Sequence, residues 1–355
     1  MNVLITGGAG FIGSELGRRL AEEQGARIMA VDSLLEQVHP SGRPPAAFPD
    51  SAVLMHNDVR DRAAWDALFA EFTPDIIVHF AAETGTAQSL TESARHASVN
   101  ATGTAEMLDA LYRAGHRPKK ILLSSSRAVY GEGAWQAQSG ETFYPGRRSN
   151  RQLSAAQWDF IGPDGVTARA LPHAGAKVLP NPTSIYGATK LSQEHILSSW
   201  CEAYDIPLSI LRFQNVYGPG QSPLNPYTGI INIFHRQAYA KQPIQVYEDG
   251  QIGRDFVFID DVVTACVAAL GNDAVTLADI GFGKVTTIHD AARIIAQIHG
   301  APEPEVCGKF RNGDVRWAVA DVAEMKEGLG VAPTVDFEEG ARRVGQWLKE
   351  TGNIG

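Results

Sequence analysis

The opening segment constrains the fold of this 355-residue chain more than any other part of it. The sequence predicts a short buried strand over residues 1–5, a turn over residues 6–13 and a helix over residues 14–23. Gly7, Gly10 and Gly13 punctuate the turn with G-x-x-G-x-x-G spacing. Such glycines let the backbone turn tightly, let a pyrophosphate approach and let the helix pack closely on the strand. A turn that serves only backbone geometry is the alternative.

A second predicted strand, over residues 27–31, ends at Asp32, about twenty residues after the glycines. A carboxylate at that place can bind both ribose hydroxyls of a dinucleotide and would repel a 2′-phosphate. No arginine follows immediately, so the sequence favours NAD over NADP. An aspartate that caps a turn is the alternative. Asp58 and Val59, after a strand predicted over residues 52–55, are candidates for an adenine contact.

Two further strands end in residues suited to a ligand site. The strand predicted over residues 76–80 runs into small residues at 81–85, which allow close approach of a flat ring system. The strand over residues 120–123 ends at Ser124, Ser125 and Ser126. Ligands collect at the carboxyl ends of strands in open parallel sheets, so the serines lie where chemistry is expected.

Tyr186 and Lys190 are the candidate proton-transfer pair, because residues four apart share one face of a helix. A phenol titrates near pH ~10, and a neighbouring cation favours the phenolate. The pair therefore predicts a general base, and the hydroxyl of Ser126 can hold the same substrate oxygen. An ordinary surface pair is the alternative, and the order of the nucleotide turn, the serine strand and the tyrosine helix argues against it.

The composition excludes several classes of protein. The net charge of −9 with dispersed basic residues argues against a nucleic-acid partner, and 44% hydrophobic residues without an apolar stretch of ~20 residues argue against a membrane span. Cys201, Cys266 and Cys307 have no paired spacing, and the ten histidines form no ligand cluster, so no metal is expected. The first strand begins at once, without a secretory leader, which predicts the cytoplasm.

The motifs together resemble the extended short-chain dehydrogenase/reductase superfamily, in its nucleotide-sugar epimerase and dehydratase branch. The resemblance covers nearly the whole chain. It rests on residues 7–13, 58–59, 79–84, 124–131, 186–190, 212–220, 253–256 and 311–314. It implies an α/β fold, a Rossmann-type doubly wound parallel sheet with a smaller C-terminal α/β substrate lobe.

The resemblance also implies roles for individual residues. It makes Tyr186 the catalytic base, Lys190 its activator and a contact of the nicotinamide ribose, and Ser126 the third catalytic residue. The expected NAD-binding residues are Gly7, Gly10, Phe11, Ile12, Gly13, Asp32, Asp58, Val59, Ala81, Ala82, Tyr186 and Lys190. The expected residues for a nucleotide-sugar substrate are Thr84, Ser126, Arg127, Asn215, Gln245, Arg254 and Arg311. For Arg254 and Arg311 a solvated surface ion pair is the alternative.

Within the branch, the 4,6-dehydratases carry Asp-Glu after the serine or threonine, whereas this chain has Arg127 and Ala128. Neither side chain can remove water, so the resemblance favours a 4-epimerase that oxidises the sugar at C4 and returns the hydride to the other face. Residues 124–132 and 214–227 resemble dTDP-L-rhamnose 4-epimerases more than UDP-galactose 4-epimerases, which suggests dTDP-L-rhamnose and dTDP-6-deoxy-L-talose. A UDP-sugar C4 or C2 epimerase, a reductase of 4-keto sugars and a dinucleotide-sensing scaffold are the alternatives.

The expected domain organisation is an NAD-binding domain over residues 1–215, to which residues 257–280 return, and a substrate lobe over 216–256 and 281–355. Helices are predicted over residues 230–240, 262–270 and 337–348, and Asp260 and Asp261 are expected to cap the second of these. Residues 132–182, called the insertion below, are expected to form a long ordered loop or a lid; a surface ornament or an oligomer contact is the alternative. The insertion lacks cysteine, which excludes a zinc ribbon. A homodimer is expected by resemblance.

Overall fold

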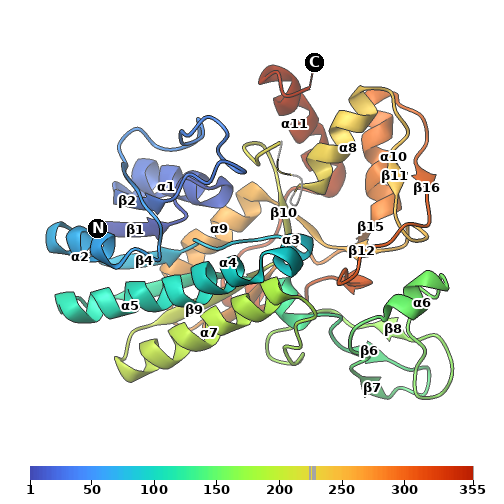
Figure 1. The fold of residues 1–355 in the computed structure, drawn as a ribbon, viewed down its shortest axis with the longest axis horizontal. Helices are drawn as coiled ribbons and strands as arrows, with labels where there is room; N and C mark the ends of the chain where they lie inside the picture. Colours follow the sequence, from blue (N-terminus) through green and yellow to red (C-terminus); the bar gives the residue numbers. More distant parts are fainter. Residues whose placement is uncertain (224, 226–228, 355) are drawn as a thin grey trace.

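A seven-stranded parallel sheet forms the centre of the computed structural model, which describes residues 1–223, 225 and 229–354 (Figure 1). The predicted doubly wound α/β fold is confirmed. The strand order is β14-β9-β5-β4-β1-β2-β3, and every neighbouring pair is parallel. The strands are β1 (Asn2–Thr6), β2 (Arg27–Asp32), β3 (Val53–His56), β4 (Ile76–His79), β5 (Lys120–Ser126), β9 (Leu208–Phe213) and β14 (Leu277–Ile280).

Helices cover both faces of this sheet because successive strand residues point to opposite faces. In β1, Val3 and Ile5 belong to one apolar core and Leu4 to another. The first core includes residues of α1 (Phe11–Gln24) and α9 (Ile259–Leu270). The second includes residues of α2 (Arg62–Glu71), α5 (Gly103–Ala114) and α7 (Ile185–Ala203). Strands buried on both faces explain the nearly uninterrupted apolar runs in the sequence.

The first helix begins earlier than the sequence predicts. The helix expected from residue 14 starts at Phe11, because Gly10 has an extended backbone and its carbonyl accepts a hydrogen bond from the Ser14 amide at 2.9 Å. The last three residues of the glycine motif, 11–13, are therefore helical. The amides of a first helical turn have no partners within the helix, so this change places free N–H groups where the motif predicts a phosphate.

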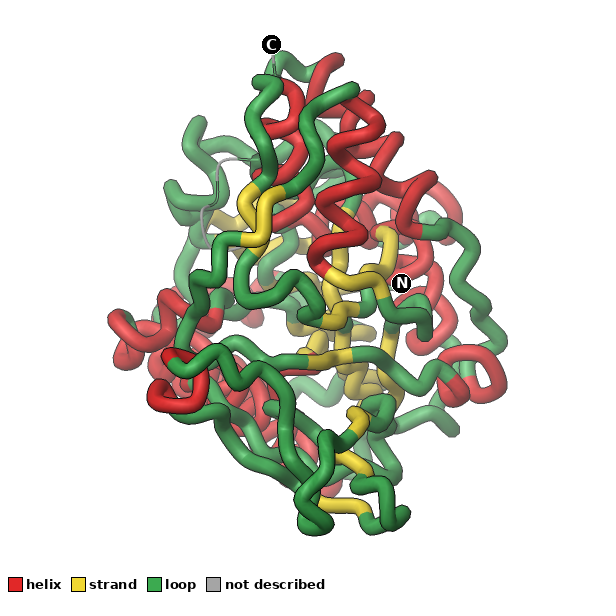
Figure 2. The backbone as a smooth tube through the Cα atoms, turned by 90° about the vertical axis from the view of Figure 1, so that its right-hand side faces the viewer, coloured by secondary structure: helices red, strands yellow, loops and turns green. Residues whose placement is uncertain are grey.

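The C-terminal part of the chain packs three helices together, α8 (Ile230–Tyr239), α10 (Ile288–His299) and α11 (Phe337–Glu350) (Figures 1 and 2). This part also contains short paired strands: β10 (Asn215–Tyr217) with β13 (Phe256–Phe258), β11 (Gln245–Val246) with β16 (Glu305–Val306), and β12 (Gly253–Arg254) between β15 (Thr286–Thr287) and β17 (Trp317–Ala318). The division into two domains stays a prediction. Leu224, Pro226 and Tyr227 of the motif over residues 214–227 lie outside the described residues.

The expected capping role of Asp260 and Asp261 is wrong. The helix starts at Ile259, Phe258 is the residue before it, and both aspartates lie inside the first turn. The Asp261 carboxylate instead accepts hydrogen bonds from the Thr334 amide at 2.9 Å and the Thr334 hydroxyl at 2.8 Å. It ties a distant loop to the helix, a role that local sequence does not reveal.

The insertion is a small folded unit rather than a loop. Strand β6 (Trp135–Gln136) pairs antiparallel with both β7 (Thr142–Phe143) and β8 (Arg169–Ala170), and a short helix, α6 (Asn150–Ser154), lies between the last two. Trp135, Phe160 and Ala168 form its apolar core, and Trp317 of β17 packs against them. The insertion is thus joined to the C-terminal part of the chain (lower right in Figure 1).

The remaining short elements are α3 (Thr86–Thr91), α4 (Ser93–Ala97), the π-helical turns η1 (Ser98–Thr102) and η3 (Glu324–Gly328), and the 3-10 turn η2 (Arg127–Tyr130). Within the described ranges, no helix combines the length and the apolar character that crossing a bilayer requires.

Two glycines of α1 provide a matched test of this packing. A Cβ atom at Gly13 would lie 2.4 Å from the Gly7 carbonyl oxygen, whereas one at Gly17 would lie 3.5 Å from Ile5, an ordinary contact. We expect Gly13→Ala to lower the free energy of unfolding by about 2 kcal/mol through overpacking. Gly17→Ala should raise it by about 0.5–1 kcal/mol through helix propensity. Urea unfolding of both variants measures the difference, and equal effects would contradict the described approach of α1 to the turn.

Candidate active site

One cavity of about 1150 Å³ opens along the carboxyl ends of the central strands. Every residue that the sequence singles out for cofactor, substrate or catalysis lines it. These are Gly7, Gly10, Phe11, Ile12, Gly13, Asp32, Asp58, Val59, Ala81, Ala82, Thr84, Ser126, Arg127, Tyr186, Lys190, Asn215, Gln245, Arg254 and Arg311. Their placement together is a structural finding, and their individual roles stay predictions.

The glycine turn forms one end of the cavity and brings two strand ends into close contact. Gly7 has φ +66°, and a Cβ atom there would lie 2.8 Å from the Ala81 amide nitrogen. The Asp32 carboxylate braces the same turn, because it accepts hydrogen bonds from the amides of Ala9 at 3.0 Å and Leu34 at 2.9 Å. The start of α1 has no side-chain cap, and the turn before it has no room for side chains, which fits a bound pyrophosphate. The carboxylate at the end of the neighbouring strand fits a ribose without a 2′-phosphate.

The end of the cavity at which the sequence predicts the adenine contact includes residues without a recognisable motif. Arg60 binds the Asp58 carboxylate, at 2.9 Å from Nε to Oδ1 and 2.6 Å from NH2 to Oδ2, and it lowers the pKa of that carboxyl. Gln37 and His39 come from the long connection between β2 and β3 and also line the cavity. In the sequence, only their position after the second strand could have indicated that Gln37 and His39 lie at the cavity.

Tyr186 is brought to the serine strand by the start of α7. The Ser184 hydroxyl caps this helix by accepting a hydrogen bond from the Gly187 amide at 3.0 Å. Gly187 lies so close to the turn after β5 that a Cβ atom would be 2.4 Å from the Ala128 carbonyl oxygen. The glycine inside the Tyr-x-x-x-Lys motif therefore allows the first turn of α7 to rest on the backbone that carries Ser126 and Arg127.

Burial, a hydroxyl group and a nearby cation act on the phenol of Tyr186. Burial raises the pKa of its phenol, while a hydrogen bond with Ser126 and the positive charge of Arg127 act in the opposite direction. Arg127 thus places a positive charge near the phenol that the sequence does not predict, and the expected role of Lys190 stays a prediction. The Lys190 ammonium donates to Gln193 Oε1 at 2.5 Å, and burial lowers the pKa of Lys190 to about 7, opposed by Glu194.

Behind Lys190 a buried polar chain connects α7 to the sheet. The Gln193 amide donates to Thr104 at 2.9 Å, and His79 contacts Thr104 at 2.8 Å and Thr6 at 2.7 Å. Burial and the Lys190 charge lower the pKa of His79 to about 3, so the imidazole is neutral. The contacts orient Gln193, which in turn holds the ammonium group.

An ion pair fixes α7 against two strands beneath the serines. Arg212 of β9 binds Glu194 of α7 at 2.9 and 2.7 Å, and the Ser125 hydroxyl of β5 donates to the same carboxylate. Both charged side chains are nearly fully buried. Such a pair contributes more to the geometry of the three elements than to net stability.

Two cations without carboxylate partners mark the other end of the cavity. Arg127 donates from Nε to Asn215 Oδ1 at 3.1 Å, and Arg254 donates to the Gly253 carbonyl oxygen at 2.8 Å. Neither forms an ion pair with a residue that the structure describes, although Arg254 is only 6% exposed. Burial and the Arg127 charge lower the pKa of Arg254 to about 9. An anion with several oxygens would satisfy both guanidinium groups.

Arg311 and Gln245 line the outer wall of this end. The Arg311 guanidinium lies 5.1 Å from the ring centre of Tyr247, and the Gln245 amide donates to Glu305 at 2.8 Å. Tyr247, Lys309 and Asp314 share this wall. The sequence did not indicate Tyr247 or Lys309, because neither belongs to a motif or a periodic pattern. In the described part of the chain, no group of three or more His, Cys, Asp or Glu side chains could hold a metal ion.

Comparison with known proteins agrees with the chemistry of the cavity. A sequence profile of the NAD dependent epimerase/dehydratase family matches residues 3–151 and 166–280. A dTDP-L-rhamnose 4-epimerase from Burkholderia thailandensis is 51% identical over 98% of this chain and 95% of its own length.

Two solved structures are similar over nearly the whole of both chains. A UDP-glucose 4-epimerase from Thermotoga maritima, crystallised with UDP-glucose, has a TM-score of 0.81 at 29% identity and covers 99% of each chain. A UDP-glucose 4-epimerase from Thermus thermophilus in complex with NAD has a TM-score of 0.77 at 27% identity, over 98% of this chain and 99% of its own.

Proposed function

This chain belongs to the NAD-dependent epimerase/dehydratase family, and we propose that it interconverts dTDP-L-rhamnose and dTDP-6-deoxy-L-talose as an NAD-dependent 4-epimerase. The activity rests on one observation: Tyr186, Ser126, Arg127 and Arg254 line the same cavity as the glycine turn, and neither arginine forms an ion pair with another described residue. The choice of substrate rests on the 51% identical relative.

The proposed chemistry divides between the cofactor and three side chains. Bound NAD supplies a hydride acceptor, which is also the hydride donor for the return step. The Tyr186 phenolate accepts the proton of the sugar C4 hydroxyl through its Oη atom, and returns a proton when the hydroxyl re-forms. The Ser126 hydroxyl donates to the C4 oxygen and stabilises the charge that develops on it. Arg127 favours the phenolate that the first proton transfer requires.

Arg127 and Ala128 distinguish this proposal from dehydration. They occupy the positions at which the resemblance places the acidic pair of the 4,6-dehydratases. A guanidinium group and a methyl group can neither donate nor remove the protons that the loss of water requires. Arg254, Arg127 and Asn215 are proposed to hold the diphosphate, because arginine matches phosphate oxygens with a planar array of donors.

The test of this function uses the purified protein and its Tyr186→Phe variant. The wild type should copurify with NAD and convert dTDP-L-rhamnose to its C4 epimer without consuming added NADH. Tyr186→Phe should keep its NAD content and lose at least about 100-fold in kcat, since it lacks the group that moves the proton. Product analysis by NMR and the absorbance of released cofactor measure both quantities.

Other results of the same assay identify the alternatives. Faster turnover of UDP-glucose or UDP-galactose would contradict the proposed substrate while keeping the 4-epimerase activity. Stoichiometric consumption of NADH would indicate a reductase, and full activity of Tyr186→Phe would remove Tyr186 from the mechanism.

The position of Arg127 predicts a change in the pH dependence of turnover. Its positive charge lowers the pKa of Tyr186, so Arg127→Met should raise that pKa further. The phenolate then forms only at higher pH, and the acidic limb of the kcat profile should move to higher pH. Arg127→Lys keeps the charge and should keep the limb near its wild-type position. Profiles that coincide for all three proteins would contradict the electrostatic role.

A homodimer is also proposed, through the outer surfaces of α5 and α7. Tyr112 of α5 is 61% exposed, and its ring centre lies 6.4 Å from that of Tyr204, which lies 4.8 Å from the ring centre of Trp200 in a tilted arrangement. An exposed aromatic group of this kind fits an interface between two copies. The cytoplasm is proposed as its location, since the three cysteines are unpaired.

Replacement of Tyr112 tests the dimer. Tyr112→Glu introduces a charge into the proposed interface and should shift the protein toward monomers in sedimentation velocity. Leu179→Glu is the matched control, because Leu179 is 68% exposed but lies in the insertion. A wild type that sediments as a monomer, or equal behaviour of both variants, would contradict this interface.

A further inference from the structure

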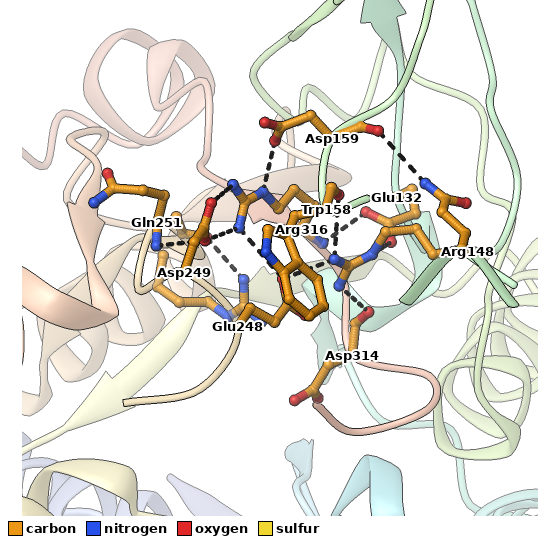
Figure 3. A network of polar contacts seen from close by, with 12 residues as sticks. Glu132, Arg148, Trp158, Asp159, Glu248, Asp249, Gln251, Asp314 and Arg316 are labelled. Atoms are coloured by element: carbon orange, nitrogen blue, oxygen red, sulfur yellow. Dashed lines mark hydrogen bonds and ion pairs between the residues drawn. The ribbon is translucent and has the colours of Figure 1, made fainter. Parts of the chain in front are cut away.

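Arg148 connects the insertion to the C-terminal part of the chain through a buried polar network (Figure 3). Its Nε atom lies 3.3 Å from Glu132 Oε1, and its NH1 atom lies 2.8 Å from Glu248 Oε2. Its NH2 atom donates to the carbonyl oxygen of Asp314 at 2.9 Å. One guanidinium group thus contacts Glu132 of the insertion and, at the same time, Glu248 and Asp314 of the C-terminal part.

Arg316 completes the network from the other side. Its backbone amide donates to Glu132 Oε2 at 2.8 Å, and its guanidinium group binds both carboxylate oxygens of Asp249, at 2.7 and 2.8 Å. It also reaches Asp159 of the insertion at 2.8 Å. The network therefore joins three segments: the insertion, residues 248–249 and residues 314–316.

Two of these segments continue directly into the outer wall of the cavity. Tyr247 precedes Glu248, and Lys309, Arg311 and Asp314 lie on the segment that ends at Arg316. The Glu248 amide donates to the Lys309 carbonyl oxygen at 2.7 Å, which holds the two wall segments together. Arg148 binds the side chain of Glu248 on one and the backbone of Asp314 on the other. Its position therefore sets the spacing of the wall.

The composition of the network favours a geometric role over a stabilising one. Arg148, Glu132 and Glu248 are 3%, 4% and 2% exposed. Desolvation of such charges largely cancels their attraction, and well-packed apolar residues would stabilise the fold as well. Directional hydrogen bonds to a carboxylate and a carbonyl on separate segments instead specify one arrangement of those segments.

We propose that Arg148 is a positioning residue for the nucleotide-sugar end of the cavity, and that the insertion serves as the support of the wall formed by residues 245–248 and 309–314. The proposal rests on the proposed function, because the wall contacts the nucleotide sugar. The cofactor end lies outside the network. Loss of Arg148 therefore changes the binding of the nucleotide sugar and leaves NAD binding intact.

Arg147 offers a matched control, because it is the same residue type one position earlier and is exposed. The experiment compares Arg148→Met, Arg148→Lys and Arg147→Met with the wild type. Arg148→Met can fold, since burial already raises the pKa of Glu132 to about 7 and the carboxyl can take up a proton once the opposing Arg148 charge is lost. Arg148→Lys keeps the charge but cannot bind three partners in one plane. It serves as the folded variant if Arg148→Met does not express.

Three measurements separate positioning from general structural damage. The KM for dTDP-L-rhamnose should rise about tenfold in Arg148→Met, less in Arg148→Lys and not in Arg147→Met. The bound NAD content should stay at the wild-type level, and kcat should change by less than about threefold. Hydrogen–deuterium exchange should increase in the peptide that contains residues 309–314 and stay unchanged in residues 2–32.

The exchange measurement does not depend on the reaction catalysed. If the wild type epimerises no nucleotide sugar, the proposed function fails, while faster exchange of residues 309–314 still assigns Arg148 to the wall. Unchanged KM and unchanged exchange in a folded Arg148 variant would overturn the proposal. An equal loss of NAD content, kcat and substrate binding would also overturn it, because that pattern indicates a general defect of the fold.

Discussion

The close contact between the first turn of α7 and the backbone after β5 is the constraint on which the site depends. Gly187 has no side chain, and the Ala128 carbonyl oxygen occupies the space that a Cβ atom would take. This contact brings a helix that carries a phenol and an ammonium group against a strand end that carries hydroxyl groups. The buried pair of Arg212 and Glu194 holds the helix in that place from below. Proton transfer at a shared substrate oxygen requires such fixed spacing, because a hydrogen bond tolerates little error in distance.

The arginines of this chain divide into two groups with different surroundings. Arg148, Arg212 and Arg316 are buried and bind carboxylates, so their charges are compensated within the protein. Arg127 and Arg254 line the cavity without such partners among the described residues. Two uncompensated guanidinium groups in a confined space repel each other, which favours an anionic ligand between them. The two groups of arginines differ in whether a carboxylate binds the guanidinium group. Residue type and burial do not distinguish them.

The sequence predicted the site residues whose place follows from the backbone of a single element. It could not predict the residues whose place depends on contacts with segments far away in the chain. The glycines at positions 7, 10 and 13, the aspartate after the second strand and the Tyr-x-x-x-Lys spacing each follow from the backbone of one element, and all of them line the cavity. Tyr247 and Lys309 lie on two segments far apart in the sequence, which the hydrogen bond from the Glu248 amide to the Lys309 carbonyl oxygen holds together. Helix spacing could not indicate the charge of Arg127 near Tyr186, because Arg127 belongs to another element, nor the hydrogen bond from Lys190 to Gln193. The fold of the insertion likewise depends on Trp317, more than a hundred residues away.

The predicted role of Asp32 in cofactor preference is linked to the integrity of the glycine turn. The carboxylate that the sequence predicts to bind the ribose lines the cavity and also accepts hydrogen bonds from the amides of Ala9 and Leu34. Redesign toward a phosphorylated dinucleotide would ordinarily begin by removing this charge. Here that substitution would leave two backbone donors without an acceptor, so a successful redesign has to supply new acceptors for both amides before a basic residue can be introduced.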